Sequence, residues 1–289
     1  MADFREIPTP TYDYDIRQLV RYYEKALGQI RLELERIDLT KMQRANVLAT
    51  QKEITLILAE LDESVGAWIT TFIPRAAEDG VIHAVMALGV VETVDEARKI
   101  VSFNRFNREL IKTAVADTQD DLLQVSQNID RKVRNAIREA TAESIRSNLT
   151  RGNNTTTPIV RDIIADMRKR LGEAVNTGII DAAGRRWNPK VYAETVVQTK
   201  MAHTQRESAI NEALGRDAYY GVISSHGAKD ACRNWEGKVV KLTPEAEGDF
   251  PYVGTLPRRE IFHPRCKHIV SPIRRLDRLP ERLRNLNGI

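Results

Sequence analysis

The chain is poor in the residues that would place it in several common classes of protein. Only 2 cysteines occur among 289 residues, too few for a disulfide framework. Aromatic residues make up 6% of the chain, and no apolar run approaches the length of a membrane span. The first eight residues contain no apolar segment, so we expect no signal peptide. These features favour a soluble protein made in a cytoplasm.

The motifs of several familiar catalytic sites are also absent. The sequence contains no Gly-rich phosphate-binding loop, no Gly-x-Ser-x-Gly turn and no His-Glu-x-x-His helix. Charged residues are abundant, at 29%, but they nearly balance, and the formal net charge is only +4. That mild excess does not by itself indicate a nucleic-acid-binding protein. A high content of charge with few aromatic residues is typical of long helices with solvated faces.

Residues 1–150 have the pattern of an elongated helical bundle. Its longest segment, 104–148, contains neither Gly nor Pro and carries apolar residues at steps of three and four, which predicts one buried helical face. The stripe consists of Ile111, Val115, Thr118, Leu122, Val125, Ile129, Val133 and Ile137. It could pack within the monomer or mediate self-association. We expect Pro74 to interrupt an earlier helix, and Thr93-Val94-Asp95-Glu96 to form a capping box.

The residue composition and the apolar pattern of the chain change after residue 150. Arg151–Pro158 is rich in residues that favour turns, and it opens a linker helix and turn over 151–189. A helix over 190–214 follows, and then short β-branched segments near residues 221–225, 238–242 and 268–271. We therefore predict a small α+β module over 190–273, with an antiparallel sheet backed by that helix, and a basic tail over 274–289. The fold class is α+β.

Cysteine and histidine concentrate in one part of the chain. The stretch 203–268 holds both cysteines and four of the five histidines. Thiol and imidazole groups in two clusters about thirty residues apart are a common way to encode a zinc site. The candidates are Cys232, Cys266, His226, His263 and His268. Neither cluster contains a Cys-x-x-Cys pair, so the alternative is that both cysteines are small core residues.

A resemblance to a known family rests on three pieces of this half of the chain. They are Gly184-Arg185-Arg186-Trp187, then Trp235-Glu236-Gly237-Lys238, and finally His263-Pro264-Arg265-Cys266-Lys267-His268. Their order and spacing, over residues 178–273, resemble the phage minor capsid protein 2 and Mu F-like head-morphogenesis proteins of tailed bacteriophages. The resemblance implies a virion component made in the bacterial host and found inside the phage head near the portal. It implies partners such as the portal protein or the major capsid protein, a role in head assembly and in packaging or ejection of DNA, and no catalysis.

One departure from this family pattern bears on the metal. Many relatives carry a Cys-x-x-Cys pair just before the Trp-x-Gly-Lys segment, and Lys229 stands here at the first of those positions. A zinc site would therefore need Cys232, Cys266 and two of the three candidate histidines. Such a Cys2His2 set is chemically adequate. The competing interpretation is that apolar packing around Trp235, Phe262 and Ile269 replaces the metal.

Basic residues gather towards the end of the chain. The candidates for contact with double-stranded DNA or with an acidic protein partner are Arg258, Arg259, Arg265, Lys267, Arg274, Arg275 and Arg278. Such residues would bind DNA through its phosphates, without sequence preference. An acidic surface on another head protein would serve equally well. A solvated helix with no partner is the remaining alternative.

An enzyme is the rival interpretation from a different class. The histidines of the C-terminal cluster, with nearby lysine and arginine, could support a metal-dependent or metal-independent nuclease, or a toxin-like enzyme. No carboxylate stands at a spacing typical of a nuclease site, and no complete catalytic set is visible. We therefore predict a non-catalytic protein with no catalytic residues and no cofactor beyond a possible structural zinc.

Overall fold

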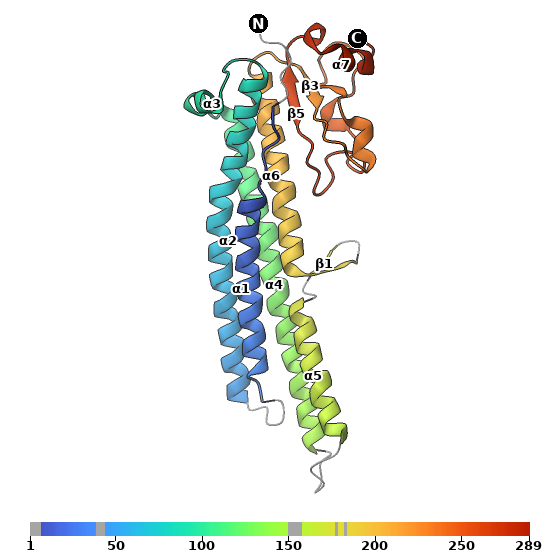
Figure 1. The fold of residues 1–289 in the computed structure, drawn as a ribbon. Helices are drawn as coiled ribbons and strands as arrows, with labels where there is room; N and C mark the ends of the chain where they lie inside the picture. The colour runs from blue at the N-terminus through green and yellow to red at the C-terminus, as the bar shows by residue number, and fades with distance from the viewer. Residues whose placement is uncertain (1–6, 39–43, 150–157, 177–178, 182–183) are drawn as a thin grey trace. The chain divides into compact units, whose positions relative to one another are not determined.

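The computed structural model describes residues 7–38, 44–149, 158–176, 179–181 and 184–289. Helices make up most of these residues, and the two small antiparallel sheets lie in the second half of the chain (Figure 1). The predicted α+β class is confirmed. Among the described residues, no helix is both long and apolar enough to cross a membrane. The turn-rich segment predicted to begin at Arg151 lies outside the described residues as far as residue 157.

Two compact units make up the chain, each assembled from separate segments. The first unit contains Met1–Tyr14, Ile69–Thr118 and Thr195–Ile289, and the second contains Asp15–Trp68 and Gln119–Glu194. The borders fall inside four helices: α1 (Asp13–Glu35), α2 (Arg44–Ala87), α4 (Arg105–Leu149) and α6 (Pro189–Leu214). The domain boundaries predicted from the sequence stay predictions.

The second unit is a helical bundle built from α1, parts of α2, α4 and α6, and α5 (Pro158–Asn176). On α4, the residues predicted to share a buried face do so: Leu122, Val125, Ile129, Val133 and Ile137 are at most 1% exposed. Thr118 is also fully buried, whereas Ile111 and Val115 are half-buried. The spacing of the apolar residues thus positions α4 as a packing helix.

Polar side chains tie the bundle together at the ends of its helices. The Arg168 guanidinium on α5 donates to the carbonyls of Leu34, Glu35 and Ile37, where α1 ends. Carbonyls at the end of a helix lack the usual partner four residues further on, and a cation there also complements the helix dipole. The Trp68 indole N–H donates to the Asp15 carbonyl at 2.9 Å, where α1 begins.

The Gly-Arg-x-Trp motif forms a small hairpin in the second unit, with strand β1 (Ile179–Ile180) antiparallel to β2 (Arg186–Trp187). The Asp181 carboxylate accepts hydrogen bonds from the Trp187 indole at 2.9 Å and from the Arg185 backbone and side chain. These bonds, that of Trp187 foremost, lower the pKa of Asp181 to about 2. The motif therefore has a structural role in this chain.

One local prediction was wrong and another is confirmed. Helix α2 continues through Pro74. Ile69, Ile73, Ala76 and Ala77 form an unbroken, fully buried face on both sides of the proline. Their packing outweighs the cost of about 3 kcal/mol that an interior proline imposes. At α3 (Val94–Ile100), the predicted capping box is present, with Thr93 and Glu96 bonding each other's backbone N–H groups.

The first unit contains a three-stranded antiparallel sheet of strand order β4-β3-β5, made of Val239–Lys241, Tyr220–Ile223 and Val270–Ile273. Helix α6 backs the sheet as predicted, because its Ile210 and Ala213 pack in one core with side chains of all three strands. Short 3-10 helices, η1 (Ala231–Trp235) and η2 (Val253–Thr255), lie in the loops between strands. These loops carry the candidate metal ligands.

The basic tail predicted for 274–289 folds back onto the sheet as η3 (Leu276–Arg278) and α7 (Glu281–Asn287). Leu279 and Leu283 join a core cluster with residues of all three strands. The Asn287 side chain accepts from the Val239 N–H at 2.8 Å and donates to the Gly237 carbonyl at 2.9 Å. Residues at the end of the sequence thus complete the module.

Gly80 lies where α2 and α6 meet at very close range, and we expect Gly80→Ala to destabilise the first unit. A Cβ atom at this position would lie 2.2 Å from the Gln205 carbonyl oxygen and 2.9 Å from the Ser208 Cβ. Since a backbone carbonyl cannot give way cheaply, the helices must move apart. The expected loss is about 1–3 kcal/mol in the free energy of unfolding, measured by urea denaturation.

Gly66 is the matched control on the same helix, because nothing lies within 4 Å of its added Cβ. Gly66→Ala should raise the free energy of unfolding by about 0.5–1 kcal/mol, since alanine favours helix over glycine. If both variants were stabilised to the same extent, the close approach at Gly80 would be excluded.

His83 should make stability depend on pH. It is 2% exposed, its Nε2 contacts the Ser271 hydroxyl at 3.1 Å, and burial lowers its pKa to about 4. Between that value and the pKa of about 6.5 in an unfolded chain, only the unfolded state binds the proton. Stability therefore falls as pH is lowered through this window, by about 3 kcal/mol in full.

The comparison that isolates this effect is urea unfolding at pH 7 and pH 4.5 for the wild type and His83→Leu. Between pH 7 and pH 4.5, the free energy of unfolding of the variant should fall by about 2–3 kcal/mol less than that of the wild type. Equal losses in the two proteins would show that His83 does not titrate in this way.

Candidate metal centre

A tight turn places His263 and Cys266 next to each other. The Cys266 N–H donates to the His263 carbonyl at 2.9 Å, closing a four-residue turn with Pro264 as its second residue. Arg265, the third residue, has φ +66°, and Phe262 before the turn has φ +58°. Left-handed backbone at non-glycine residues costs on the order of 1 kcal/mol each and persists where the surroundings impose it. Here the Arg265 guanidinium is held by the Thr195 hydroxyl at 3.1 Å.

Cys232 reaches the same place from the short helix η1. Asp230 caps this helix by accepting from the Cys232 N–H at 3.1 Å. Asp is a favoured residue at such a position, because its side chain satisfies a backbone donor that the helix leaves unpaired. Cys232 itself is 1% exposed and Cys266 is 8% exposed. Two loops that are separate in sequence thus present two buried thiols to each other.

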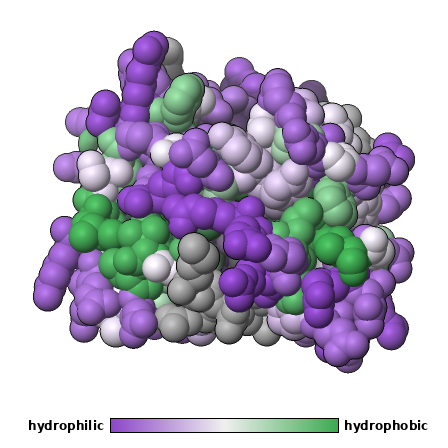
Figure 2. Space-filling model, turned by 90° about the horizontal axis from the view of Figure 1, so that it is seen from above, coloured by the Kyte–Doolittle hydropathy of each residue, from purple (hydrophilic) through white to green (hydrophobic). Residues whose placement is uncertain are grey.

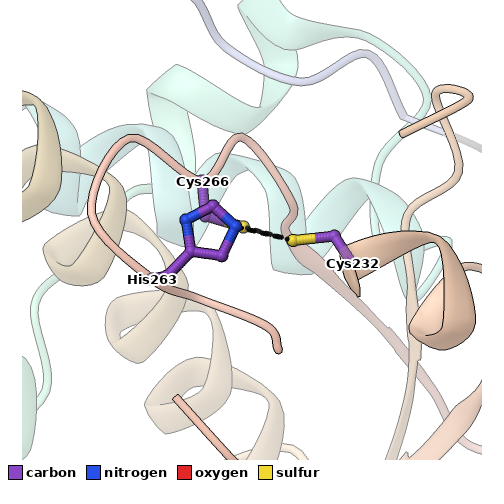
Figure 3. Close-up of side chains that lie close together, drawn as sticks. All are labelled: Cys232, His263 and Cys266. Carbon is purple, nitrogen blue, oxygen red and sulfur yellow. Dashed lines mark hydrogen bonds between the residues drawn. The ribbon is translucent and has the colours of Figure 1, made fainter. Parts of the chain in front are cut away.

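Cys232, His263 and Cys266 form a compact group of possible metal ligands (Figure 3). The two sulfur atoms lie 3.7 Å apart, and the Cys232 sulfur lies 3.0 Å from His263 Nε2. Two thiolates on one tetrahedral zinc, each about 2.3 Å from the ion, lie roughly 3.8 Å apart. The spacing of the sulfurs therefore fits shared coordination, and a hydrogen bond between thiols is the alternative within the protein alone.

Hydrogen bonds orient the His263 ring so that Nε2 faces the sulfur. Its Nδ1 lies 2.9 Å from the Pro264 carbonyl, which only accepts, so Nδ1 carries a proton. The neutral ring then presents a lone pair on Nε2. A bond from the second ring nitrogen to a carbonyl is the usual support for a metal-bound histidine. Asp230 Oδ2 also lies 3.2 Å from Nε2, so Nε2 donates to this carboxylate when the ring is protonated and must lose that proton to bind a metal ion.

His226, Glu236 and His268 form a second group beside the first. His268 is 2% exposed, with Nε2 3.2 Å from the Glu236 carboxylate and Nδ1 3.3 Å from the Cys266 sulfur. The His226 ring is exposed and lies against the His268 ring, with centroids 4.0 Å apart. The same Glu236 oxygen accepts from the backbone N–H groups of His226 and Ala228, both at 2.9 Å.

The electrostatics of the two groups differ. Burial, followed by the neighbouring Cys266, raises the pKa of the Cys232 thiol to about 12. Burial also works against ionisation of Glu236, but hydrogen bonds from Ala228, His226 and His268 outweigh it and lower the pKa of Glu236 to about 2. Burial and the nearby His226 lower the pKa of His268. A divalent cation among these groups would favour the thiolate forms of the cysteines.

All five sequence candidates lie in these two groups, three in the first and two in the second. The donors of the first group, two sulfurs and an imidazole nitrogen, fit zinc. Sequence reasoning missed Asp230 and Glu236, although the pattern Asp-x-Cys contains a favoured capping residue. It also missed Arg206, which is 7% exposed and stacks on the Phe262 ring at 4.1 Å.

The basic residues predicted to contact DNA or an acidic partner differ in their surroundings: some bond to other residues of the chain, and others are exposed. Arg265 bonds to Thr195, Arg274 donates to the carbonyls of Arg216 and Leu88, and Arg275 pairs with Asp277. Arg258, Arg259 and Lys267 are exposed. Figure 2 shows a largely hydrophilic face, with hydrophobic residues in separate areas. This face offers charged and polar groups over much of its area.

The comparison with protein families agrees with this architecture. The model of the family "Phage minor capsid protein 2" matches residues 41–287. The chain belongs to the phage minor capsid protein 2 family. No curated protein and no solved structure matches it. Membership makes this a structural protein of the phage virion that associates with other head components.

In this member of the minor capsid family, the Trp-x-Gly-Lys motif contacts both the loop before the candidate ligand His263 and the helix α7. The Trp235 indole donates to Glu260 at 3.1 Å, and the Lys238 ammonium donates to the Leu286 carbonyl at 3.2 Å. Gly237 has φ +74°, and a Cβ there would lie 2.9 Å from Leu286 Cδ2. The positive φ favours glycine here, and an added Cβ would also require the Leu286 side chain to shift.

Proposed function

We propose that this minor capsid protein acts without catalysis inside the phage head, close to the portal, where it assists head assembly and the packaging or ejection of DNA. Its C-terminal module would present exposed basic side chains to packaged DNA or to an acidic surface of the portal or major capsid protein. A structural zinc would hold the loops of that module. The observation that carries the proposal is the family match over residues 41–287.

The exposed cations favour a contact through charge. Arg258, Arg259 and Lys267 are on the same polypeptide segment as the metal loop, and all three are exposed. Their positive charges would neutralise phosphates and release counterions, with no need to read a base sequence. A contact of this kind suits a protein that meets packaged DNA of any sequence. Carboxylates on another head protein could form ion pairs with the same basic side chains.

The experiment compares DNA affinity at several salt concentrations for the full-length wild type and the triple variant Arg258→Gln, Arg259→Gln, Lys267→Gln. If each side chain meets one phosphate, the slope of log affinity against log salt should become shallower by about 0.9 per contact. Arg275→Gln is the control, because that guanidinium is paired with Asp277. An unchanged slope in the triple variant would exclude these residues from DNA contact. Binding to purified portal protein then tests the other partner.

Location in the head requires the virion itself. Heads assembled with and without this protein should differ in density inside the shell near the portal vertex when imaged by electron cryomicroscopy. A difference confined to the outer surface would contradict the proposed location. The DNA content of the two preparations measures the effect on packaging.

A nuclease is the alternative activity, and the contacts of Cys232 and Asp230 with His263 invite the comparison. Two observations count against it. Cys232 is 1% exposed, so substrate cannot reach its thiol, and His263 Nδ1 is bonded to a carbonyl where a catalytic triad would place a carboxylate. We expect supercoiled plasmid to stay intact with the purified protein, with or without Mg²⁺ or Zn²⁺. Nicking that Cys232→Ser abolishes would establish the enzyme.

A further inference from the structure

We infer that His268, through Nδ1, is the fourth ligand of the zinc proposed above, and that Glu236 is the positioning residue that holds it. His226 lies outside the metal shell. The inference rests on the proposed zinc, and it selects the fourth ligand from two histidines and one aspartate that the composition of the loops leaves equivalent.

The first step is the protonation of the His268 ring. Its Nε2 lies 3.2 Å from Glu236 Oε1. A carboxylate only accepts hydrogen bonds, so Nε2 must carry the proton. The lone pair of the neutral ring is then on Nδ1, and Nδ1 lies 3.3 Å from the Cys266 sulfur. The ring thus turns its free lone pair towards a thiol of the compact group.

The second step is the fixed position of Glu236. Its Oε1 accepts from the backbone N–H groups of His226 and Ala228, each at 2.9 Å. Between them, Gly227 has φ +72°, the left-handed conformation that lets both N–H groups reach one oxygen. Glu236 directly follows helix η1, which carries Cys232 near its start. The segment of η1 and Glu236 therefore supplies one ligand, Cys232, and positions a second, His268, through the Glu236 carboxylate.

A carboxylate behind a metal-bound imidazole is a known supporting arrangement. It fixes the tautomer, orients the ring and makes the ligand nitrogen more basic. Each candidate histidine ligand has a hydrogen-bond acceptor on its second ring nitrogen. For His263 it is the Pro264 carbonyl, and for His268 it is the Glu236 carboxylate. His268 lies outside the compact group of Cys232, His263 and Cys266. A small inward movement of its ring would therefore accompany metal binding.

The competing ligands fit less well. His226 is exposed and shares its group with Glu236 and His268, not with the thiols. Asp230 Oδ2 lies 3.2 Å from His263 Nε2, but the Asp230 side chain is 57% exposed and its other oxygen caps η1. A structural zinc site is usually closed and made of sulfur and nitrogen donors. His268, at 2% exposure, meets that description.

The test uses full-length protein with Zn²⁺ or Co²⁺ added and measures affinity by competition with a chromogenic chelator. Glu236→Gln should bind zinc about 10–100-fold more weakly than the wild type, the usual cost of losing a supporting carboxylate. His268→Ala should weaken binding further and alter the visible spectrum of the Co²⁺ form. His226→Gln is the matched control from the same group and should bind like the wild type. Circular dichroism checks the fold of each variant, and Glu236→Gln decides the question if His268→Ala does not fold.

The outcomes separate this inference from the proposal beneath it. If Glu236→Gln and His268→Ala bind zinc like the wild type while Cys266→Ser does not, zinc is present and His268 is not a ligand. Loss of binding in Asp230→Asn, with His268→Ala unaffected, would assign the fourth position to Asp230. If the wild type binds neither metal ion, the zinc proposal fails together with this inference.

Discussion

Replacing Leu122 and Ile129 with aspartate should unfold the second unit. Both side chains lie on the buried face of α4, at 1% and 0% exposure. An unpaired charge forced into a core costs about 3–5 kcal/mol, so two of them cost about 6–10 kcal/mol, which is comparable with the total stability of about 5–15 kcal/mol of a typical domain. Circular dichroism at 222 nm should show a large loss of helix at 25 °C.

The control for this experiment lies on the same helix. Leu123 and Gln127 are exposed, Leu123 at 42%. The double variant Leu123→Asp, Gln127→Asp adds the same two carboxylates one or two positions from the buried pair. It should keep its helical signal and its hydrodynamic radius. Equal behaviour of the two double variants would show that the stripe is not a packing face.

Removal of the proposed zinc should have the second large effect. If metal is present at about 1,000 times its Kd, binding stabilises the folded state by about 4 kcal/mol. A loss of that size lowers the Tm of a domain of 150–250 residues by roughly 8–16 °C. We therefore expect a strong chelator to lower the Tm of the wild type by about 10 °C, measured by calorimetry. Unfolding of the first unit should account for the shift, because it contains both cysteines.

Cys266→Ser distinguishes a metal site from a buried thiol. If zinc is bound, the variant should melt at a lower temperature, and the chelator should change its Tm little further. If the cysteines only pack, the substitution still destabilises, but the chelator leaves the wild type unaffected. Elemental analysis of protein purified without added metal should find about one equivalent of zinc. Folded protein with only trace zinc would overturn the metal site.

Much of the helical architecture was predictable because it depends on local rules. The three- and four-residue spacing of apolar side chains identified the buried face of α4, and the Thr93–Glu96 pattern identified the cap of α3. Pro74 shows where local rules end. Proline disfavours a helix interior on its own, but the buried face that runs past it belongs to a packed structure whose stability the local sequence does not express.

The candidate site also has features that the local sequence predicts and features that it does not. Residue type and spacing alone identified Cys232, Cys266 and the three histidines as candidate ligands, because few other side chains bind zinc. Which of them meet was decided by tertiary structure: the turn at Arg265, the cap by Asp230 and the carboxylate of Glu236 set the direction of each donor atom. Donor direction depends on backbone torsions and on hydrogen bonds between loops about thirty residues apart, and neither is encoded in local spacing. Sequence therefore determined the chemistry available to this protein, and the fold decided its geometry.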